Sequence, residues 1–362
     1  MSEHDERFMA MAVEQARDAL GTTAPNPSVG SVIVRDGVVL GVGRTQPIGG
    51  PHAEVMSLRD AQKNGHDVRG ATVYVTLEPC RHVGRTPPCT RALLEAGIAR
   101  VVVGAVDPYP PMQGKGLEEL RSAGVQVDLG LRGDACTDLI RGFARAVRHE
   151  LPEVTLKVAS SLDGRIATVS GESQWITGES ARADGHRLRA SHDAIVVGIG
   201  TVLADNPRLT TRMQGGTDAV PVVLDSNLRI PPGAALFGGT RRPIVICAHD
   251  APDIALDADI IRVARSGSGI DPVLAMTALA NRGLHRVLVE GGGRVSRSLI
   301  DAALVDHLVL YLGAVAIPGG IPWLGGDALD RLASAVRPTL RSIGMLGGDA
   351  VLRYGLPHRL EG

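Results

Sequence analysis

The feature that most constrains the fold is an alternation of short apolar strands with amphipathic helices, which begins near the N-terminus. Expected strands in the first half of the chain are Val29–Val34, Val38–Val42, Ala71–Leu77, Val101–Val106 and Val125–Leu129. Expected helices are Phe8–Leu20, Ala53–Lys63, Arg91–Ala96, Leu117–Ala123 and Asp134–Arg148. Period-2 and period-3.6 apolar patterns that alternate in this way predict a layered α/β domain.

The same alternation starts again after Glu150-Leu151-Pro152. Expected strands there are Val154–Ala159, Ala194–Ile199, Val220–Leu224, Pro243–Cys247, Arg286–Glu290 and His307–Leu312. Expected helices are Ser180–Ala190, Pro272–Asn281 and Ser296–Ala303, and the stretches Met213–Ala219 and Ala316–Asp327 are expected to be loops. A length of 362 residues suits two domains. We therefore expect domains of residues 1–150 and 151–362.

Composition narrows the class of partner. A net charge of −1 argues against a broad surface for nucleic acid or membrane, and an aromatic content of 2% argues against base stacking. The charged N-terminal residues exclude a signal peptide, and no apolar run approaches the roughly 18 residues that cross a bilayer. We expect a cytoplasmic homo-oligomer that acts on a small molecule and has no nucleic-acid or membrane partner.

One cluster of residues carries the ligand set of a catalytic metal. Pro51-His52-Ala53-Glu54 precedes Glu78-Pro79-Cys80, and Cys89 follows after eight intervening residues. His52, Cys80 and Cys89 provide three ligands for Zn²⁺, whose fourth position then holds water. The metal lowers the pKa of that water toward about 7. Glu54 lies near the metal but is not a ligand, which suits a general acid and base.

Two other interpretations of the cluster stay open. His82, between the two cysteines, could complete a structural four-ligand site, or the cysteines could be incidental core residues. Cys136 and Cys247 lie in apolar surroundings and are expected in the core. A His-x-Glu pair followed by Pro-Cys is the pattern of zinc deaminases that act on cytosine and adenine, here with a cysteine spacer of eight residues instead of two.

Longer motifs resemble one family in order along nearly the whole chain. The segments Asn26–Gly30, Pro51–Glu54 and Thr76–Cys89 resemble the deaminase half of the bifunctional riboflavin-biosynthesis deaminase/reductase family. Its reductase half is matched by Leu156–Arg165, Ser173–Thr177, Gly200–Pro207 and Val289–Gly293. The resemblance implies a cytidine-deaminase-like three-layer domain followed by a dihydrofolate-reductase-like α/β domain. It also implies Zn²⁺ and NADPH as cofactors.

The implied reactions are the deamination of a diaminopyrimidinone that carries ribosylamino 5′-phosphate, followed by reduction of the ribosyl chain to ribityl. Two alternatives stay open: a paralogue that acts on another pyrimidine, and a zinc deaminase with a non-catalytic binding domain. Many members have His where this chain has Thr45 and Asn where it has Tyr109, both on the pyrimidine side of the pocket. These departures concern substrate contact and not the zinc chemistry.

The resemblance also implies binding residues in both halves. In the deaminase half the substrate residues are Asn26, His82 and Arg85; turn formation is the alternative for Asn26 and surface solvation the alternative for Arg85. In the reductase half the substrate residues are Lys157, Ser173, Arg189, Leu209, Arg212 and Glu290. The cofactor residues are Ala159, Trp175, Thr201, Asp205, Ser226, Gly292, Gly293, Arg294, Val295, Ser296, Arg297 and Ser298.

Structural roles remain the alternative for several of these residues. The glycine triplet could be a simple turn instead of a phosphate-binding loop, and Trp175 could be a core residue. Arg212 could be a surface residue, whereas Arg189 and Glu290 could form a buried ion pair with each other. Lys157 lies in an otherwise apolar strand, where a charged group is costly to bury without a role.

Overall fold

A computed structural model describes residues 2–82, 87–213 and 215–357. The chain divides into two units, Met1–Glu150 and Leu151–Gly362. Each unit has its own sheet and its own apolar core.

The first unit is built on a five-stranded sheet with the order β2-β1-β3-β4-β5. Its strands are β1 (Gly30–Arg35), β2 (Val38–Arg44), β3 (Thr72–Leu77), β4 (Arg100–Ala105) and β5 (Gln126–Leu129). β1 pairs antiparallel with both β2 and β3, whereas β3, β4 and β5 run parallel. The hairpin and the later strands expected from the sequence are therefore present.

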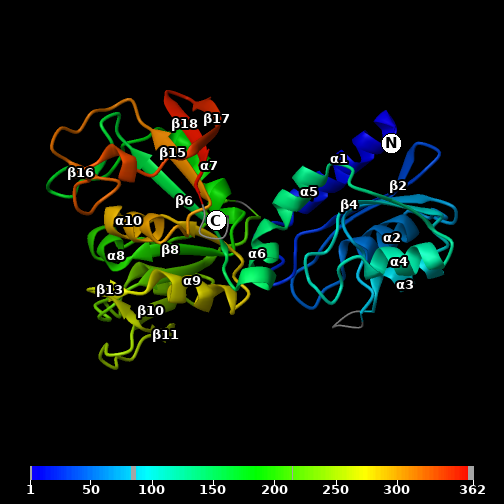
Figure 1. Cartoon of the computed structure of the whole chain (residues 1–362), viewed down its shortest axis with the longest axis horizontal. Helices are drawn as coiled ribbons and strands as arrows, with labels where there is room; N and C mark the ends of the chain where they lie inside the picture. The colour runs from blue at the N-terminus through cyan, green and yellow to red at the C-terminus, as the bar shows by residue number, and fades with distance from the viewer. Residues whose placement is uncertain (1, 83–86, 214, 358–362) are drawn as a thin grey trace. The chain divides into compact units, whose positions relative to one another are not determined.

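Helices cover both faces of this sheet and give three layers (Figure 1). On one face lie α1 (Glu3–Arg17) and α5 (Gly133–Leu139); on the other lie α2 (Ala53–Lys63), α3 (Cys89–Glu95) and α4 (Lys115–Ser122). Glycines let the helices approach closely: a Cβ on Gly43 would lie 2.3 Å from the Ala53 carbonyl oxygen. The start of α2 is thus pressed against the sheet.

The helical stretch expected over Asp134–Arg148 is present, but as two helices instead of one. The chain forms α5 and then α6 (Arg141–His149), because the backbone leaves the helical region at Ile140. Leu139 and Ile140 are both buried in the core of the unit. The break between the two helices allows both of these neighbouring side chains to point into the core.

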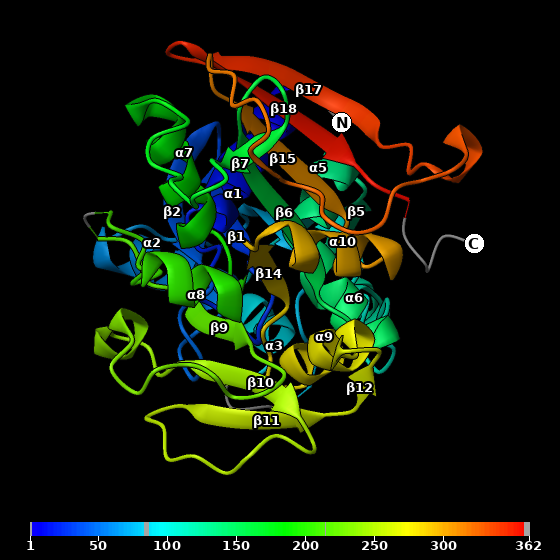
Figure 2. The same ribbon diagram turned by 90° about the vertical axis from the view of Figure 1, so that its left-hand side faces the viewer.

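The second unit has a nine-stranded sheet with the order β11-β10-β9-β8-β14-β6-β15-β18-β17, seen in Figure 2. Its strands are β6 (Glu153–Ser160), β8 (Ala194–Gly198), β9 (Val220–Leu224), β10 (Ile244–Ala248), β11 (Asp259–Val263), β14 (Arg286–Val289), β15 (His307–Leu312), β17 (Thr339–Leu346) and β18 (Asp349–Gly355). All neighbouring strands are parallel except the final pairs that involve β18. The sequence did not predict β11, β17 or β18.

Helices again cover both faces of the sheet. The cores place α7 (Glu179–Ala190) and α8 (Ile199–Asp205) on one face and α9 (Pro272–Ala280) and α10 (Gly293–Asp301) on the other. The strand that was expected to end at Ile199 ends at Gly198, and Ile199 starts α8. Short elements complete the unit: β7 (Arg165–Ala167), β12 (Arg265–Ser266), β13 (Gly269–Ile270), β16 (Ile321–Pro322) and the 3₁₀ turns Ala235–Gly238 and Leu332–Ser334.

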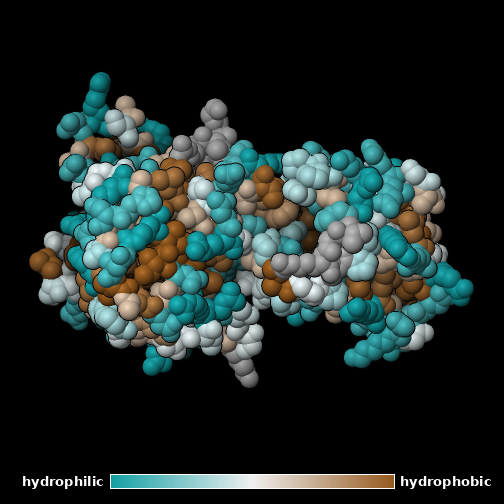
Figure 3. Space-filling model, turned by 90° about the horizontal axis from the view of Figure 1, so that it is seen from below, coloured by the Kyte–Doolittle hydropathy of each residue, from teal (hydrophilic) through white to brown (hydrophobic). Residues whose placement is uncertain are grey.

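The parallel strands bring the end of β6, the end of β8 and the residue after β14 to one edge of the sheet. Open α/β sheets bind ligands outside the carboxyl ends of their strands. Apolar and hydrophilic residues are interspersed on the face of the molecule shown in Figure 3. Within the described residues, no helix is both long and apolar enough to cross a membrane.

Candidate active sites

His52, Cys80 and Cys89 meet at the amino ends of α2 and α3. His52 caps α2, Cys80 follows β3, and Cys89 begins α3. The His52 Nδ1 atom lies 3.5 Å from Cys80 Sγ and 3.4 Å from Cys89 Sγ. A tetrahedral zinc with metal–sulfur bonds of about 2.3 Å and a metal–nitrogen bond of about 2.05 Å requires N···S distances of about 3.5 Å. Both N···S distances therefore match a tetrahedral zinc site, and all three ligand atoms lie within 4.8 Å of one another.

The two thiols are not equivalent in the absence of a cation. A hydrogen bond from Cys89 stabilises the Cys80 thiolate and lowers the pKa of Cys80 to about 4, whereas the pKa of Cys89 is raised by the same contact and by burial. The pair thus shares one proton. A divalent metal holds both sulfurs as thiolates, because metal binding displaces thiol protons.

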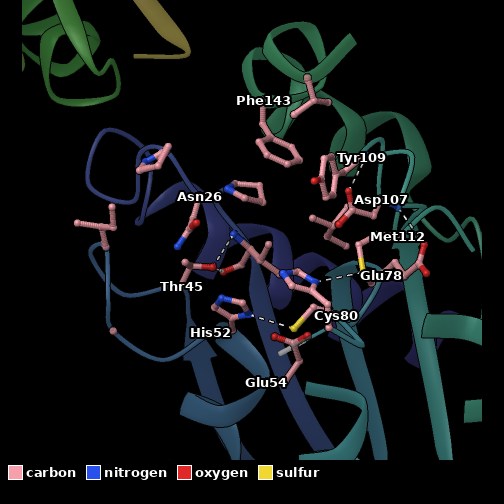
Figure 4. A pocket seen from close by; sticks show the side chains of 18 of the residues that line it. Asn26, Thr45, His52, Glu54, Glu78, Cys80, Asp107, Tyr109, Met112 and Phe143 are labelled. Carbon is pink, nitrogen blue, oxygen red and sulfur yellow. Dashed lines mark hydrogen bonds between the residues drawn. The ribbon is translucent and has the colours of Figure 1, made fainter. Parts of the chain in front are cut away.

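Glu54 is the second residue of α2, in the first turn after His52. Its side chain is buried, and it lines the cavity close to His52 and Cys80 (Figure 4). Burial, together with the negative charge of Cys80, raises the pKa of Glu54 to about 7. The Glu54 carboxyl group is not a member of the metal cluster, but it lines the same cavity.

His82 does not join the cluster among the described residues. Its Nδ1 atom instead lies 3.3 Å from the sulfur of Met112. A structural four-ligand site completed by His82 is therefore not what the structure shows among the described residues. His82 does line the same cavity as Glu54, as the substrate-binding prediction requires. Arg85 lies outside the described residues.

The cavity above the cluster has a volume of about 350 Å³. Asn26, Thr45 and Tyr109 all line it, and Figure 4 shows them around its mouth. The Thr45 hydroxyl accepts a hydrogen bond from the Val29 amide (3.2 Å), so this hydroxyl is already engaged by the backbone. Phe143, on α6, also lines the cavity; the sequence analysis did not identify it.

Glu78 organises the far wall of this cavity, a role that the sequence analysis missed. Its buried carboxylate accepts hydrogen bonds from the backbone amides of Asp107 (3.1 Å), Gly114 (2.8 Å) and Gly116 (2.8 Å). The last amide approaches closely, since a Cβ on Gly116 would lie 2.2 Å from the Pro79 carbonyl oxygen. Glu78 thus ties the loop after β4 to the segment that carries Cys80.

A second cavity, of about 710 Å³, lies at the carboxyl edge of the larger sheet. Eight residues predicted to bind substrate or cofactor line it: Lys157, Trp175, Arg189, Thr201, Asp205, Leu209, Arg212 and Glu290. Trp175 is not a core residue, because 66% of it is exposed and the guanidinium of Arg182 lies 4.3 Å from its ring centre. The remaining predicted residues do not line this cavity.

Those remaining residues occupy neighbouring segments. Ala159 is in β6, Ser226 follows β9, and Ser173 is half-buried in the loop before α7. Gly292 caps α10, and Gly293, Arg294, Val295, Ser296, Arg297 and Ser298 form its first turns. A Cβ on Gly293 would lie 2.8 Å from the Pro322 carbonyl oxygen, so close backbone approach also requires glycine there. Their binding of a dinucleotide stays a prediction.

Arg189 and Glu290 form the ion pair that the sequence analysis named as an alternative. Arg189 Nε and Nη2 donate to the two carboxylate oxygens at 2.7 and 2.8 Å, and Nη1 donates to the Thr210 carbonyl oxygen at 3.0 Å. Burial opposes ionisation of Glu290, but Lys157 and Arg189 outweigh it and lower its pKa to about 2. Contact of either side chain with substrate stays a prediction.

Comparison with known proteins places this geometry in a family. The family model described as "RibD C-terminal domain" matches residues 152–351 of this chain. The model described as "Cytidine and deoxycytidylate deaminase zinc-binding region" matches residues 2–105. The RibD riboflavin biosynthesis protein of Aquifex aeolicus is 35% identical over 97% of this chain and 98% of its own length. That of Escherichia coli is 38% identical over 96% and 98%. This chain belongs to the RibD family.

Solved structures agree with that assignment. RibD of Acinetobacter baumannii has a TM-score of 0.87 at 35% identity, covering 98% of this chain and 99% of the other. The Thermotoga maritima diaminohydroxyphosphoribosylaminopyrimidine deaminase/5-amino-6-(5-phosphoribosylamino)uracil reductase has a TM-score of 0.88 at 34% identity, with the same coverage. The expected order, a zinc-binding deaminase domain before a reductase domain, is confirmed.

Proposed function

We propose that the protein catalyses two successive steps of riboflavin biosynthesis. The first unit hydrolytically deaminates 2,5-diamino-6-(5-phosphoribosylamino)pyrimidin-4(3H)-one, and the second reduces the ribosyl chain of the product to ribityl with NADPH. The observation that carries the proposal is the pairing, in one RibD chain, of a three-ligand cluster beside buried Glu54 with a separate basic cavity.

In the deaminase cavity, His52, Cys80 and Cys89 hold the zinc ion, which supplies a water molecule acidic enough to act as a nucleophile near neutral pH. Glu54 accepts the proton of this water and delivers it to a ring nitrogen of the pyrimidine. The same carboxylate then takes the remaining proton of the added hydroxyl group and passes it to the amino group, which leaves as ammonia. Burial suits Glu54 to this task, because a carboxyl group kept from bulk water exchanges protons only with what enters the cavity.

In the reductase cavity, the hydride comes from NADPH, and the protein has to hold the sugar carbon against the nicotinamide. Lys157 and the Arg189–Glu290 pair lie at the strand ends, where they can hold sugar hydroxyls and phosphate. The amino end of α10 offers backbone amides to the dinucleotide phosphates. The Glu290 carboxylate repels the dinucleotide phosphates, so these lie at the α10 end of the site and the substrate lies at the strand ends.

Thiolate metal ligands are retained most readily in a reducing compartment, which supports a cytoplasmic location. The proposed homo-oligomer is tested by sedimentation of the purified protein. Neither feature changes the chemistry assigned to the two cavities.

The proposed sequence of reactions is tested by incubating the purified protein with the diaminopyrimidine phosphate. We expect ammonia release without NADPH, and NADPH oxidation only after ammonia has appeared. NADPH oxidation that precedes ammonia release would mean that reduction comes first, and neither product would refute the proposed substrate.

A further inference from the structure

Helix α7 presents a row of basic side chains to the reductase cavity. Arg182, His186 and Arg189 are spaced by four and three residues, lie on one face of the helix, and all line the cavity. Strand β6 also comes close to α7: a Cβ on Gly185 would lie 3.7 Å from Cε of Lys157. His186 therefore lies among arginine and lysine side chains that stay charged. Of the α7 residues in this wall, only Arg189 has a role in the proposed mechanism.

The imidazole of His186 has an unused polar atom. Its Nδ1 is buried and has no hydrogen-bond partner among the described residues. Buried polar side-chain atoms are nearly always paired, because burying one without a partner costs free energy. Because His186 lines the cavity, a turn of its ring about the Cβ–Cγ bond would present this nitrogen to a ligand oxygen there.

Charge defines the kind of ligand. Five arginine and lysine residues of the described chain line the cavity, against two carboxylates: Lys157, Arg182, Arg189, Arg208, Arg212, Asp205 and Glu290. Arg189 already uses three of its N–H groups on Glu290 and Thr210. A doubly charged anion in this cavity therefore needs donors besides Arg189, and His186 is the neighbouring side chain able to gain one by taking up a proton.

We propose that His186 is a further binding residue for the substrate's phosphate in the reductase site, and that it takes up a proton as the phosphate binds. This inference rests on the proposed function for the identity of the phosphate. In the free protein, burial and the charges of Arg189, Arg212 and Lys157 lower the pKa of His186, with Glu290 acting in the opposite sense. A bound dianion reverses the balance and raises this pKa.

Because the pKa of His186 is low in the free site and higher in the complex, the affinity for a dianion depends on pH. The imidazole is neutral in the free site and protonated in the complex over the pH window between its two pKa values. Binding of a dianion therefore strengthens as pH falls through that window, by up to about tenfold per pH unit for one linked proton. Below the lower pKa the effect ends, because the free site is already protonated.

Sulfate is a suitable probe, since it remains a dianion from pH 5 to 8 and so adds no titration of its own. Calorimetric titration of the full-length protein with sulfate, in two buffers of different ionisation enthalpy, measures affinity and proton uptake together. We expect uptake in the unmodified protein, which His186→Gln abolishes together with most of the pH dependence. His249→Gln, at an exposed histidine of the same unit, should behave like the unmodified protein.

A second set of binding measurements, with ribose 5-phosphate and with NADPH, distinguishes a site for the substrate's phosphate from a site for the cofactor's phosphates. His186→Gln should weaken binding of ribose 5-phosphate about tenfold or more at pH 6.5 and leave NADPH binding unchanged. The proposal is overturned if sulfate affinity keeps its pH dependence in His186→Gln, or if NADPH affinity falls while ribose 5-phosphate affinity does not. Should the variant fold poorly, the NMR titration of His186 in the unmodified protein decides: its pKa must rise on adding sulfate. The reductase assay with the aminouracil phosphate tests the proposed function separately.

Discussion

Replacing Glu78 with Gln should loosen the deaminase cavity without removing any group that touches the metal. The Glu78 carboxylate accepts three backbone hydrogen bonds, and hydrogen bonds to a charged group contribute about 1.5–3 kcal/mol each. Glutamine keeps one acceptor oxygen and turns an N–H₂ group toward an amide donor. Loss of one charged bond, weakening of the others and this repulsion together predict a loss of about 2–4 kcal/mol in the unfolding free energy of the first unit.

For a unit of 150 residues, this loss corresponds to a fall in Tm of roughly 6–12 °C. Scanning calorimetry of the full chain with saturating zinc measures it, with Glu95→Gln as the control because Glu95 is exposed and pairs only with nearby Arg91 among the described residues. Ammonia release should weaken, since the Asp107–Gly114 loop lines the cavity, whereas reduction of the aminouracil substrate should not. A Tm within 1 °C of the unmodified protein, with normal ammonia release, refutes this role for Glu78.

Three further predictions concern the metal, the units and the buried ion pair. Cys89→Ser should lose both bound zinc and deamination, and elemental analysis that finds full zinc content in this variant contradicts the ligand assignment. Residues 1–148 and 152–362, made separately, should each keep part of one reaction; two folded but inactive fragments would point to a shared site. Glu290→Gln should cost about 3–5 kcal/mol by leaving Arg189 buried without its counter-charge. The same variant should impair reduction while its NADPH affinity, measured by fluorescence titration, stays unchanged. A selective loss of NADPH binding would instead place Glu290 on the cofactor side of the cavity.

The strongest sequence patterns predicted the smaller sheet, all strands of the larger sheet except β11, β17 and β18, and the metal cluster, because each depends on local periodicity or short spacing. His52 and Glu54 share one helix end, so a three-residue motif suffices to place them. The Glu78 contacts were not predictable, since they join a carboxylate to amides 29–38 residues away in a loop without a pattern. The pairing of Arg189 with Glu290 spans 101 residues and was left as one of two alternatives.

Other elements were missed for reasons of packing. β17 is mostly exposed on both faces, so its residues show no apolar alternation. Phe143 lines the deaminase cavity only because the chain breaks at Ile140 and redirects α6, and the helical periodicity of that stretch gave no indication of the break.

The central claim is that one chain holds two separate chemistries, with Glu54 serving only the first. The most direct test follows ammonia release and NADPH oxidation by Glu54→Gln, with zinc content measured on the same sample. We predict full zinc content, ammonia release reduced about 100-fold or more, and no NADPH oxidation from the diaminopyrimidine phosphate. Normal NADPH oxidation should return when the aminouracil phosphate is supplied instead. Ammonia release near the normal rate, or loss of NADPH oxidation with the aminouracil phosphate, would contradict this account.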